Sequence, residues 1–377
     1  EPIGSGGMAR LYLARTTGLG GFEKRVVLKQ IHPHLAQDAE FIARFIQEAR
    51  LTATLEHPNI AAVYEVDVHE GIHFYAMEYV RGRDLRKVLR RAVEHKRALA
   101  VSEIVAIVSA LCAGLHHAHG KRSAEGEPLG IVHRDVSPSN VLIGFEGAVK
   151  LTDFGVAKAR IGMVTTDAGT LRGKIPYMSP EQCRGEALDR RSDVYAVGLL
   201  MWEMLTGVRL RREETEIAMI RTIADCDAPS PLALRADCPA ALEKIVMQAL
   251  ERSAATRYQS AAALQTALDE FGRESKLGAS ASSVAGLMEE LFGEELLETF
   301  PSRQQAAIGT GTRELATATL APVGLEVETT FDEAPTRAVD LVAAGAADPV
   351  SQVETRRSRS GLAVGLSLGV LVVAGGL

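Results

Sequence analysis

The sequence predicts an α+β protein in which a small strand-rich part with one helix precedes a larger, mostly helical part. In the first part, residues 10–14 and 24–30 have the composition of strands, and a turn-rich stretch over 16–22 connects them. In the second part, over residues 84–275, long apolar-rich segments are typical of helices. We therefore expect the architecture to change near residue 80.

One helix is expected within the strand-rich part. Residues 38–55 place apolar side chains at spacings of three and four, and the sequence His-Pro-Asn over 57–59 ends the segment. These apolar positions are Phe41, Ile42, Phe45, Ala49 and Leu55. Two further strands are predicted over residues 61–68 and 72–80.

Three long segments of the second part are predicted to be helices. They cover residues 101–119, 192–206 and 260–271. The segment over 192–206 is apolar nearly all round, which indicates a buried helix.

Charge and cysteine content exclude some classes of function. The 377 residues carry a formal net charge of −6 without a dominant basic stripe, which argues against a nucleic-acid partner. The four cysteines form no Cys-x-x-Cys pair, so we expect reduced thiols rather than a disulfide framework or a zinc site. The sequence begins at Glu1, just before a glycine-rich loop, and we expect a fragment whose first strand is partly missing.

The composition changes beyond Lys276. A short amphipathic helix is predicted within residues 276–300, and we expect it to pack on its own domain rather than to form a partner site. Its apolar stripe consists of Leu287, Met288, Leu291, Phe292 and Leu296. Residues 301–360 have the composition of a flexible, disordered linker.

The last segment, over residues 361–377, contains no charged residue. Three arginines precede it, at positions 356, 357 and 359. Its length is at the short end for a spanning helix, and the arginines favour a cytoplasmic location for everything before it. We expect a single-pass anchor in the cell membrane, and a buried or aggregated tail is the alternative.

Two polar motifs carry the strongest chemical signal. Asp135 and Asn140 lie in the sequence His-Arg-Asp-Val-Ser-Pro-Ser-Asn, and Asp153 opens the sequence Asp-Phe-Gly. Apolar runs flank both motifs, so short strands would bring the three polar groups to one strand–loop edge. Asp135 can accept a proton, and Asn140 and Asp153 can hold a metal ion, which suits phosphoryl transfer. A turn or a helix cap would explain any one of these residues, but not both motifs together.

Two further features fit the same chemistry. The loop over residues 4–9 is glycine-rich and lies between strands, so its backbone amides could approach phosphates; a plain hairpin turn is the alternative. Lys29 ends a strand and would lie under this loop, unless it only reaches solvent. Glu48 shares a helix face with Phe41 and Phe45, and a partly buried glutamate needs a partner such as Lys29.

Over roughly residues 1–272 these motifs resemble the eukaryotic-type protein kinase family, in its bacterial Ser/Thr branch. The resemblance implies a two-lobed fold with a β-rich N-lobe over 1–80 and a helical C-lobe over 81–275. It also implies ATP in the cleft with Mg²⁺, or alternatively Mn²⁺, and proteins as substrates. The implied function is a Ser/Thr protein kinase in membrane-associated signalling, with autophosphorylation that a dimer would allow.

The resemblance assigns roles to residues. Lys29, Glu48 and Asp135 would be catalytic, and Asn140 and Asp153 would bind the metal. Residues 77–80 resemble the hinge that hydrogen-bonds adenine through its backbone, with Met77 as gatekeeper. Nucleotide contacts are implied for Ile3, Gly4, Ser5, Gly6, Gly7, Leu11, Val27, Lys29, Met77, Glu78, Val80 and Leu142.

Other matches concern the C-lobe. The sequence Ser179-Pro180-Glu181 resembles the motif that closes the activation segment, and its glutamate is expected to pair with Arg257. Asp193 and Gly198 resemble positions of the buried helix that anchors the catalytic loop.

Some positions depart from the family pattern. Thr52 stands where a bulky apolar residue is usual, so the active form would depend more on a partner or on phosphorylation. Ser137 replaces the usual lysine two residues after the catalytic aspartate, and Lys174 replaces the usual threonine. We expect Lys174 to supply the missing positive charge; the alternative is that it points to solvent and catalysis is weak.

The activation segment offers candidate modification sites. Arg134 beside Asp135 resembles kinases that phosphorylation activates, and Thr165, Thr166 and Thr170 are the candidate acceptors. Two alternatives to an active protein kinase remain, a pseudokinase or scaffold and a small-molecule kinase of similar fold. Retention of the five polar residues at the predicted site argues against the first, and the residues of the activation-segment motif argue against the second.

Overall fold

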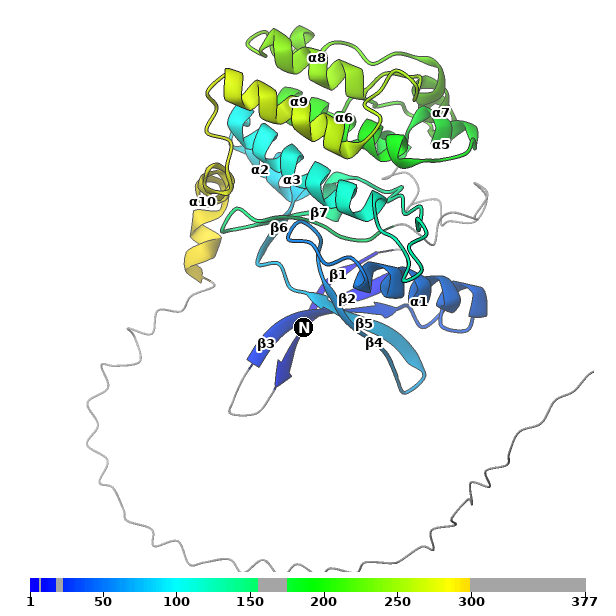
Figure 1. Ribbon diagram of the computed structural model, residues 1–377. Coiled ribbons are helices and arrows are strands. Elements are labelled where there is room, and N and C mark those ends of the chain that lie inside the picture. Colours follow the sequence, from blue (N-terminus) through cyan, green and yellow to red (C-terminus); the bar gives the residue numbers. More distant parts are fainter. Residues whose placement is uncertain (7, 18–22, 155–174, 299–377) are drawn as a thin grey trace, which may run out of the picture. The chain divides into compact units, whose positions relative to one another are not determined.

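The computed structural model describes residues 1–6, 8–17, 23–154 and 175–298 (Figure 1). The predicted linker and membrane segment, over 301–360 and 361–377, lie outside the described residues. So do Gly7, Gly155, Lys174 and the three activation-segment threonines, Thr165, Thr166 and Thr170.

A five-stranded antiparallel sheet forms the N-terminal part, with the order β1-β2-β3-β5-β4. Its strands are β1 Pro2–Ser5, β2 Ala9–Thr17, β3 Glu23–Ile31, β4 Val63–His69 and β5 Ile72–Glu78. The predicted strands are confirmed, although β4 begins two residues later than expected and β5 ends two residues earlier. The glycine-rich loop joins β1 to β2, as the sequence indicated.

Helix α1, Ala39–Ala53, confirms the single helix of this part. The Asp38 side chain accepts hydrogen bonds from two backbone amides of the first turn and so caps the helix. Phe45 and Ala49 are buried against the sheet, and the Phe45 ring lies 5.0 Å from that of Tyr75 on β5. This packing turns the same helix face, and with it Glu48, towards β3.

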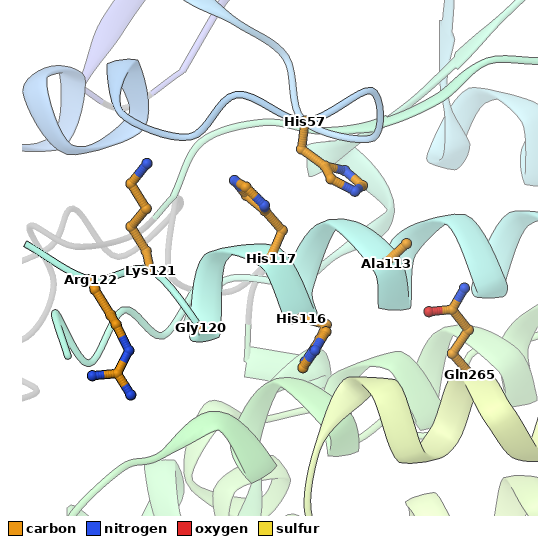
Figure 2. Close-up of a pocket in the computed structure, with 8 residues that line it drawn as sticks. All are labelled: His57, Ala113, His116, His117, Gly120, Lys121, Arg122 and Gln265. Atoms are coloured by element: carbon orange, nitrogen blue, oxygen red, sulfur yellow. The ribbon is translucent and has the colours of Figure 1, made fainter. Parts of the chain in front are cut away.

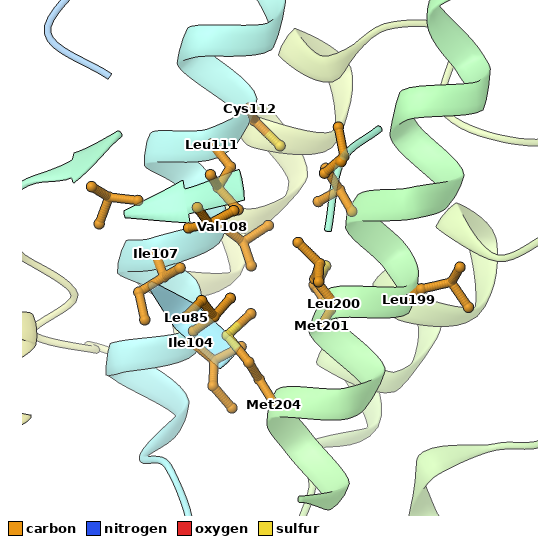
Figure 3. Packing of buried hydrophobic residues seen from close by; sticks show 14 of the residues in the cluster. Leu85, Ile104, Ile107, Val108, Leu111, Cys112, Leu199, Leu200, Met201 and Met204 are labelled. Carbon is orange, nitrogen blue, oxygen red and sulfur yellow. The ribbon is translucent and has the colours of Figure 1, made fainter. Parts of the chain in front are cut away.

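Helices form most of the remaining described chain. They are α2 Leu85–Glu94, α3 Val101–His119, α5 Pro180–Arg184, α6 Arg190–Thr206, α7 Glu216–Asp225, α8 Ala240–Ala249, α9 Ala261–Glu274 and α10 Ala281–Glu298. The three long helices predicted from the sequence are present as α3, α6 and α9. Figure 3 shows α3 and α6 side by side, with Ile104, Leu111, Leu200 and Met204 in the core between them. Residues all round α6 are buried, as the sequence predicted.

A small three-stranded sheet lies between these two parts of the chain. Its strands are β6 Gly82–Asp84, β7 Val141–Gly144 and β8 Val149–Leu151, in that order. The first residue of β7 pairs with the last residue of β8, Val141 with Leu151. The residue before β7 and the residues after β8 therefore lie at one edge, and these include Asn140 and Asp153.

The loop between α1 and β4 contacts the small sheet and α3. The Asn59 side chain donates to the Val149 carbonyl at 2.9 Å, and its own carbonyl accepts from the Leu151 amide at 2.9 Å. A Cβ atom at Gly114 of α3 would lie only 2.8 Å from the Asn59 carbonyl oxygen. Glycine at position 114 therefore permits this close approach.

Helix α10 covers the predicted amphipathic segment but is not straight. Backbone angles at Phe292 (φ −135°, ψ 17°) interrupt it, a feature that the apolar stripe did not indicate. Among the described residues, α3 alone is long and apolar enough to cross a membrane. Its packing in the core identifies it as an interior helix of the domain.

Candidate functional site

Lys29 lies between two carboxylates. Its Nζ atom is 3.2 Å from Glu48 Oε1 on α1 and 2.7 Å from Asp153 Oδ1, just after β8. The sheet brings Lys29 inwards, and the buried face of α1 points Glu48 towards it. The structure thus brings together three residues that the sequence analysis proposed for one site.

Charge outweighs burial at this lysine. Burial disfavours an ammonium ion, but the carboxylates of Asp153 and Glu48 raise the pKa of Lys29 well above its ordinary value. Tyr75 contributes a neutral phenol, because burial and the two nearby carboxylates raise its pKa. The Tyr75 hydroxyl is 3.5 Å from Glu48 Oε1, and its ring lies under the ammonium at 5.4 Å. Lys29 is therefore a fixed positive charge at neutral pH.

The loop that contains Asp135 is held by internal hydrogen bonds. His133 is fully buried, and its Nδ1 accepts from the Asp135 amide at 3.3 Å. Its Nε2 lies 3.1 Å from the Thr152 carbonyl, so these partners assign the proton to Nε2. The His133 ring also packs against Phe154 at 4.5 Å. This histidine therefore joins the loop of Asp135 to the segment of Asp153.

Asp193 of α6 anchors the same loop. Its buried carboxylate accepts from the amides of His133 and Arg134, both at 2.8 Å, and lies 2.7 Å from His119 Nε2. Burial alone would raise the pKa of Asp193, but the hydrogen bond and charge of His119 hold it below its ordinary value. Arg134 has a left-handed backbone (φ 64°), and these bonds offset its strain. The anchoring role expected of Asp193 matches this geometry.

Asn140 and Asp153, the residues expected to bind a metal ion, carry suitable oxygen atoms. The Asn140 Nδ2 group donates to the Asp135 carbonyl at 2.8 Å and to Asp135 Oδ2 at 3.0 Å, so the amide oxygen is turned away from Asp135. The Asp153 side chain is 35% exposed and its backbone is left-handed (φ 59°). One carboxylate and one amide fit Mg²⁺, which takes most remaining ligands from water and phosphate. Among the described residues, no cluster of three His, Cys, Asp or Glu side chains could hold a metal by itself.

The residues expected around adenine are only partly brought together. Leu11, Val27 and Met77 belong to one apolar cluster, and Val27 pairs directly with Met77 across β3 and β5. Ile3 on β1 is 44% exposed, and Val80 and Leu142 are half-buried outside that cluster. Gly4, Ser5 and Gly6 lie at the end of β1 and in the loop after it.

The Glu78 side chain is held by two contacts within the protein. Lys150 Nζ lies 3.0 Å from Glu78 Oε1, and the Ala62 amide donates to Glu78 Oε2 at 3.2 Å. The side chain of Glu78 therefore ties β5 to β8 and to the start of β4. These contacts leave its backbone for adenine, as expected of the hinge.

The expected pair of Glu181 and Arg257 is present as a two-bonded ion pair. The guanidinium donates to the two carboxylate oxygens at 2.7 and 2.8 Å, and the Ser192 hydroxyl donates to the same carboxylate at 2.7 Å. Burial would raise the pKa of Glu181, but Arg257 lowers it below its ordinary value. The neighbouring Gln182 side chain donates to the Arg134 carbonyl at 2.9 Å. The ion pair thus holds the segment of Glu181 and Gln182, which contacts the loop of Asp135.

Two departures from the family pattern have a described environment. The Thr52 hydroxyl is buried and donates to the Glu48 carbonyl one turn earlier, at 2.8 Å, so the small residue is satisfied within α1. Ser137 is buried as well, and its carbonyl accepts from the Asn140 amide at 3.0 Å. Lys174, its expected counterpart, lies outside the described residues.

Sequence reasoning missed several supporting residues. The His119 ring contacts the Asp193 carboxylate, and Lys150 forms an ion pair with Glu78. His32 Nε2 lies 2.7 Å from the Gly6 carbonyl in the glycine-rich loop. Three histidines, His116, His117 and His119, lie in the last turn of α3, and the sequence does not single out His119 among them. The other two contacts join residues far apart in the sequence, in different strands or just beyond strand ends, so a periodic pattern does not reveal them.

A separate basic cavity lies along the last turns of α3. It has a volume of about 650 Å³ and contains none of the residues proposed for catalysis. Figure 2 shows His57 and His117 facing each other above α3, with Lys121 and Arg122 beyond the end of the helix. The two imidazole rings are 5.0 Å apart.

Comparison with known proteins gives one consistent result. A family model described as the protein kinase domain matches residues 1–268. The tyrosine-protein kinase MasK of Myxococcus xanthus is 38% identical over 78% of this chain and 45% of its own length. The serine/threonine-protein kinase PrkC of Bacillus subtilis is 34% identical over 71% of this chain and 40% of its own length. The chain thus spans less than half the length of these two relatives.

Solved structures support the same fold. The crystal structure of the Mycobacterium tuberculosis PknI kinase domain superposes with a TM-score of 0.54 at 29% sequence identity. The match covers 71% of this chain and 92% of that domain. The strand-rich part with one helix and the helical part described above are therefore the two lobes of a kinase fold.

Proposed function

The chain belongs to the eukaryotic-type protein kinase family, in its bacterial serine/threonine branch, and on this premise we propose that it transfers the γ-phosphate of ATP to Ser and Thr hydroxyls of proteins. The observation that carries the proposal is the position of Lys29 between Glu48 and Asp153. A scaffold that only binds partners would have no chemical need for a charge held in this way. A pseudokinase is the alternative function.

The proposed roles follow from the charges of the site. Lys29, held by Glu48, would neutralise the phosphates of ATP, and Asp135 would orient the acceptor hydroxyl and take its proton. Asn140 and Asp153 would hold Mg²⁺, which neutralises the phosphate charge when it is bound. The backbone of residues 77–80 would bind adenine between Val27 and Leu142, with the glycine-rich loop above the phosphates.

The acceptor residue divides two candidate activities. Pro138 and the serine/threonine kinases among the relatives favour Ser and Thr. The relative from Myxococcus xanthus is named a tyrosine-protein kinase, which makes tyrosine the second candidate. Acid hydrolysis of protein labelled from ATP distinguishes them: we expect phosphoserine and phosphothreonine, and label on tyrosine alone would contradict the proposal.

We further propose that Lys174 compensates for Ser137. A hydroxyl at 137 leaves the transferred phosphate without its usual lysine, and an ammonium at 174 would approach from the other side of the acceptor. Lys174→Ala should then lower the transfer rate, and Ser137→Lys combined with Lys174→Thr should restore it. Ser137 is buried, so Ser137→Lys alone serves as the folding control, with its unfolding midpoint measured beside its activity. Full activity of Lys174→Ala would show that Lys174 only points to solvent.

Phosphorylation of the activation segment is a further proposal. The Nε atom of Arg134 is buried and has no hydrogen-bond partner within the described part of the chain, which supports a phosphate as its eventual partner. Thr165, Thr166 and Thr170 are the candidate acceptors. Mass spectrometry after incubation with ATP identifies the residue, and its replacement by alanine should lower activity as much as Arg134→Gln does. Activity unchanged by every single alanine replacement would contradict this proposal.

Membrane attachment is proposed from the sequence of the C-terminal segment. The uncharged run over 361–377 behind three arginines would anchor the kinase domain on the cytoplasmic side. In cells, the 377-residue chain should sediment with membranes, and a chain that ends at residue 360 should not. Equal partition of both chains would contradict the anchor.

A further inference from the structure

Helix α10 belongs to the folded core although it lies beyond the residues that the family model matches, which end at 268. Its apolar side chains are nearly fully buried in the core cluster of the helical lobe. They are Val284, Leu287, Met288, Leu291 and Phe292. Figure 1 shows α10 beside this lobe, and it contacts α2, α3 and β7. This segment is therefore an integral part of the described domain.

Glu295 on the second half of α10 joins two arginines. Its carboxylate contacts Arg83 of β6 and Arg91 of α2; the Arg83 Nε atom lies at 3.1 Å and an Arg91 nitrogen at 2.5 Å. The Phe292 ring faces both guanidinium groups, at 5.9 Å from Arg83 and at 5.3 Å from Arg91. Burial would raise the pKa of Glu295, but hydrogen bonds from the two arginines lower it. Glu295 is thus charged and held in place at neutral pH.

Arg83 lies on a strand that borders the proposed nucleotide site. Strand β6 follows the hinge by two residues and pairs with β7: Asp84 lies opposite Leu142, and Arg83 opposite Ile143. Leu142 is the proposed floor of the adenine site. Glu295 therefore holds the strand that supports this floor.

The first half of α10 touches the other end of the same small sheet. Gly147, in the turn between β7 and β8, has φ 86°, and a Cβ atom there would lie 1.8 Å from the Ala281 carbonyl oxygen. Only glycine allows the turn to pack this closely on α10. Asn140 directly precedes β7 and Asp153 follows β8, so both lie at the edge of this sheet opposite the turn. Helix α10 thus fixes the small sheet at two separate points.

We propose that α10 is a brace for the nucleotide site and that Glu295 is a positioning residue for ATP binding. Glu295 acts through Arg83 on β6 and through β6 on Leu142. Loss of its charge leaves two partly buried arginines without their carboxylate and lets β6 move relative to β7. The inference rests on the proposed function, because it assigns Leu142 and the hinge to ATP.

A binding measurement separates this inference from catalysis. The 377-residue chain is titrated with Mg²⁺ and a non-hydrolysable ATP analogue in a calorimeter. Glu295→Gln should weaken binding by about three-fold or more, the scale of coupling between linked elements. Glu295→Arg should weaken it further, and adding Arg83→Glu and Arg91→Glu should restore most of the affinity.

Glu290→Gln is the matched control on the same helix. Glu290 is half-exposed and pairs with Arg97, away from β6, at 3.0 Å. This variant should bind the analogue like the parent chain, even where its unfolding midpoint falls as much as that of Glu295→Gln. Unchanged affinity in Glu295→Gln would overturn the brace alone. A parent chain that does not bind the analogue would overturn the proposed function as well.

Discussion

The Nζ atom of Lys29 lies closer to Asp153, at 2.7 Å, than to Glu48, at 3.2 Å. The carboxylate proposed for Mg²⁺ therefore also holds the lysine proposed for the phosphates. A cation bound at Asp153 would compete for that carboxylate, and Glu48 would then keep the lysine in place. The two acidic residues thus have complementary roles: Glu48 holds the lysine within the N-lobe, and Asp153 links it to the C-lobe.

The first prediction concerns this lysine. Lys29→Met should lower the rate of phosphoryl transfer by roughly 10²- to 10³-fold, the usual effect of removing one preorganised electrostatic group. The rate is measured with labelled ATP and a generic protein substrate. Lys24→Met is the control: Lys24 lies on the same strand, over the Tyr64 ring, and is remote from Glu48 and Asp153. Equal losses in the two variants would contradict the role of Lys29.

The second prediction concerns stability. Arg257 is fully buried with Glu181, and Arg257→Met leaves that carboxylate buried without its partner. Such a change should lower the free energy of unfolding by about 3–5 kcal/mol, as measured by urea denaturation. Arg191→Met removes an exposed pair with Asp189 and should cost no more than about 1 kcal/mol. A loss for Arg257→Met as small as that for Arg191→Met would show that the buried pair is not a support.

The third prediction concerns acid. Burial lowers the pKa of His57 and His117 from the ordinary 6.5, and nearby cations add to this: His117 and Lys150 for His57, Lys121 and His116 for His117. Because the folded state binds fewer protons than the unfolded state, the stability these rings contribute is complete above pH 6.5 and is lost as the pH falls below it. The urea concentration at the unfolding midpoint should therefore decrease as the pH is lowered from about 7.5 to about 5.5.

A double variant identifies the source of that fall. His57→Gln with His117→Gln should make the urea midpoint less dependent on pH over this range. His69→Gln, at a side chain 81% exposed, should leave the dependence as it is. If the double variant loses stability with acid as steeply as the parent chain, the imidazole pair is not responsible.

The sequence predicted the residues of the site better than the residues that hold them in place. Lys29, Glu48 and Asp153 could be proposed together because each lies in a short motif next to a strand or on a helix face. The contact of His119 with Asp193 and that of Glu295 with Arg83 join residues 74 and 212 positions apart. Such pairs depend on how whole elements pack, which local periodicity does not contain. The break at Phe292 escaped prediction for the same reason, since the apolar stripe continues through it.

The most direct test of the central claim compares the parent chain with Asp135→Asn. Both are incubated with γ-labelled ATP, Mg²⁺ and a generic protein substrate. The Asn140 side chain donates a hydrogen bond to the Asp135 carboxylate. Asparagine at position 135 keeps the size of the side chain, but its amide cannot accept the proton of the acceptor hydroxyl. The account predicts clear labelling by the parent chain and a rate about 10²- to 10⁴-fold lower for the variant. Equal labelling by both, or none by the parent chain after activation-segment phosphorylation, would contradict a catalytic role and favour a scaffold.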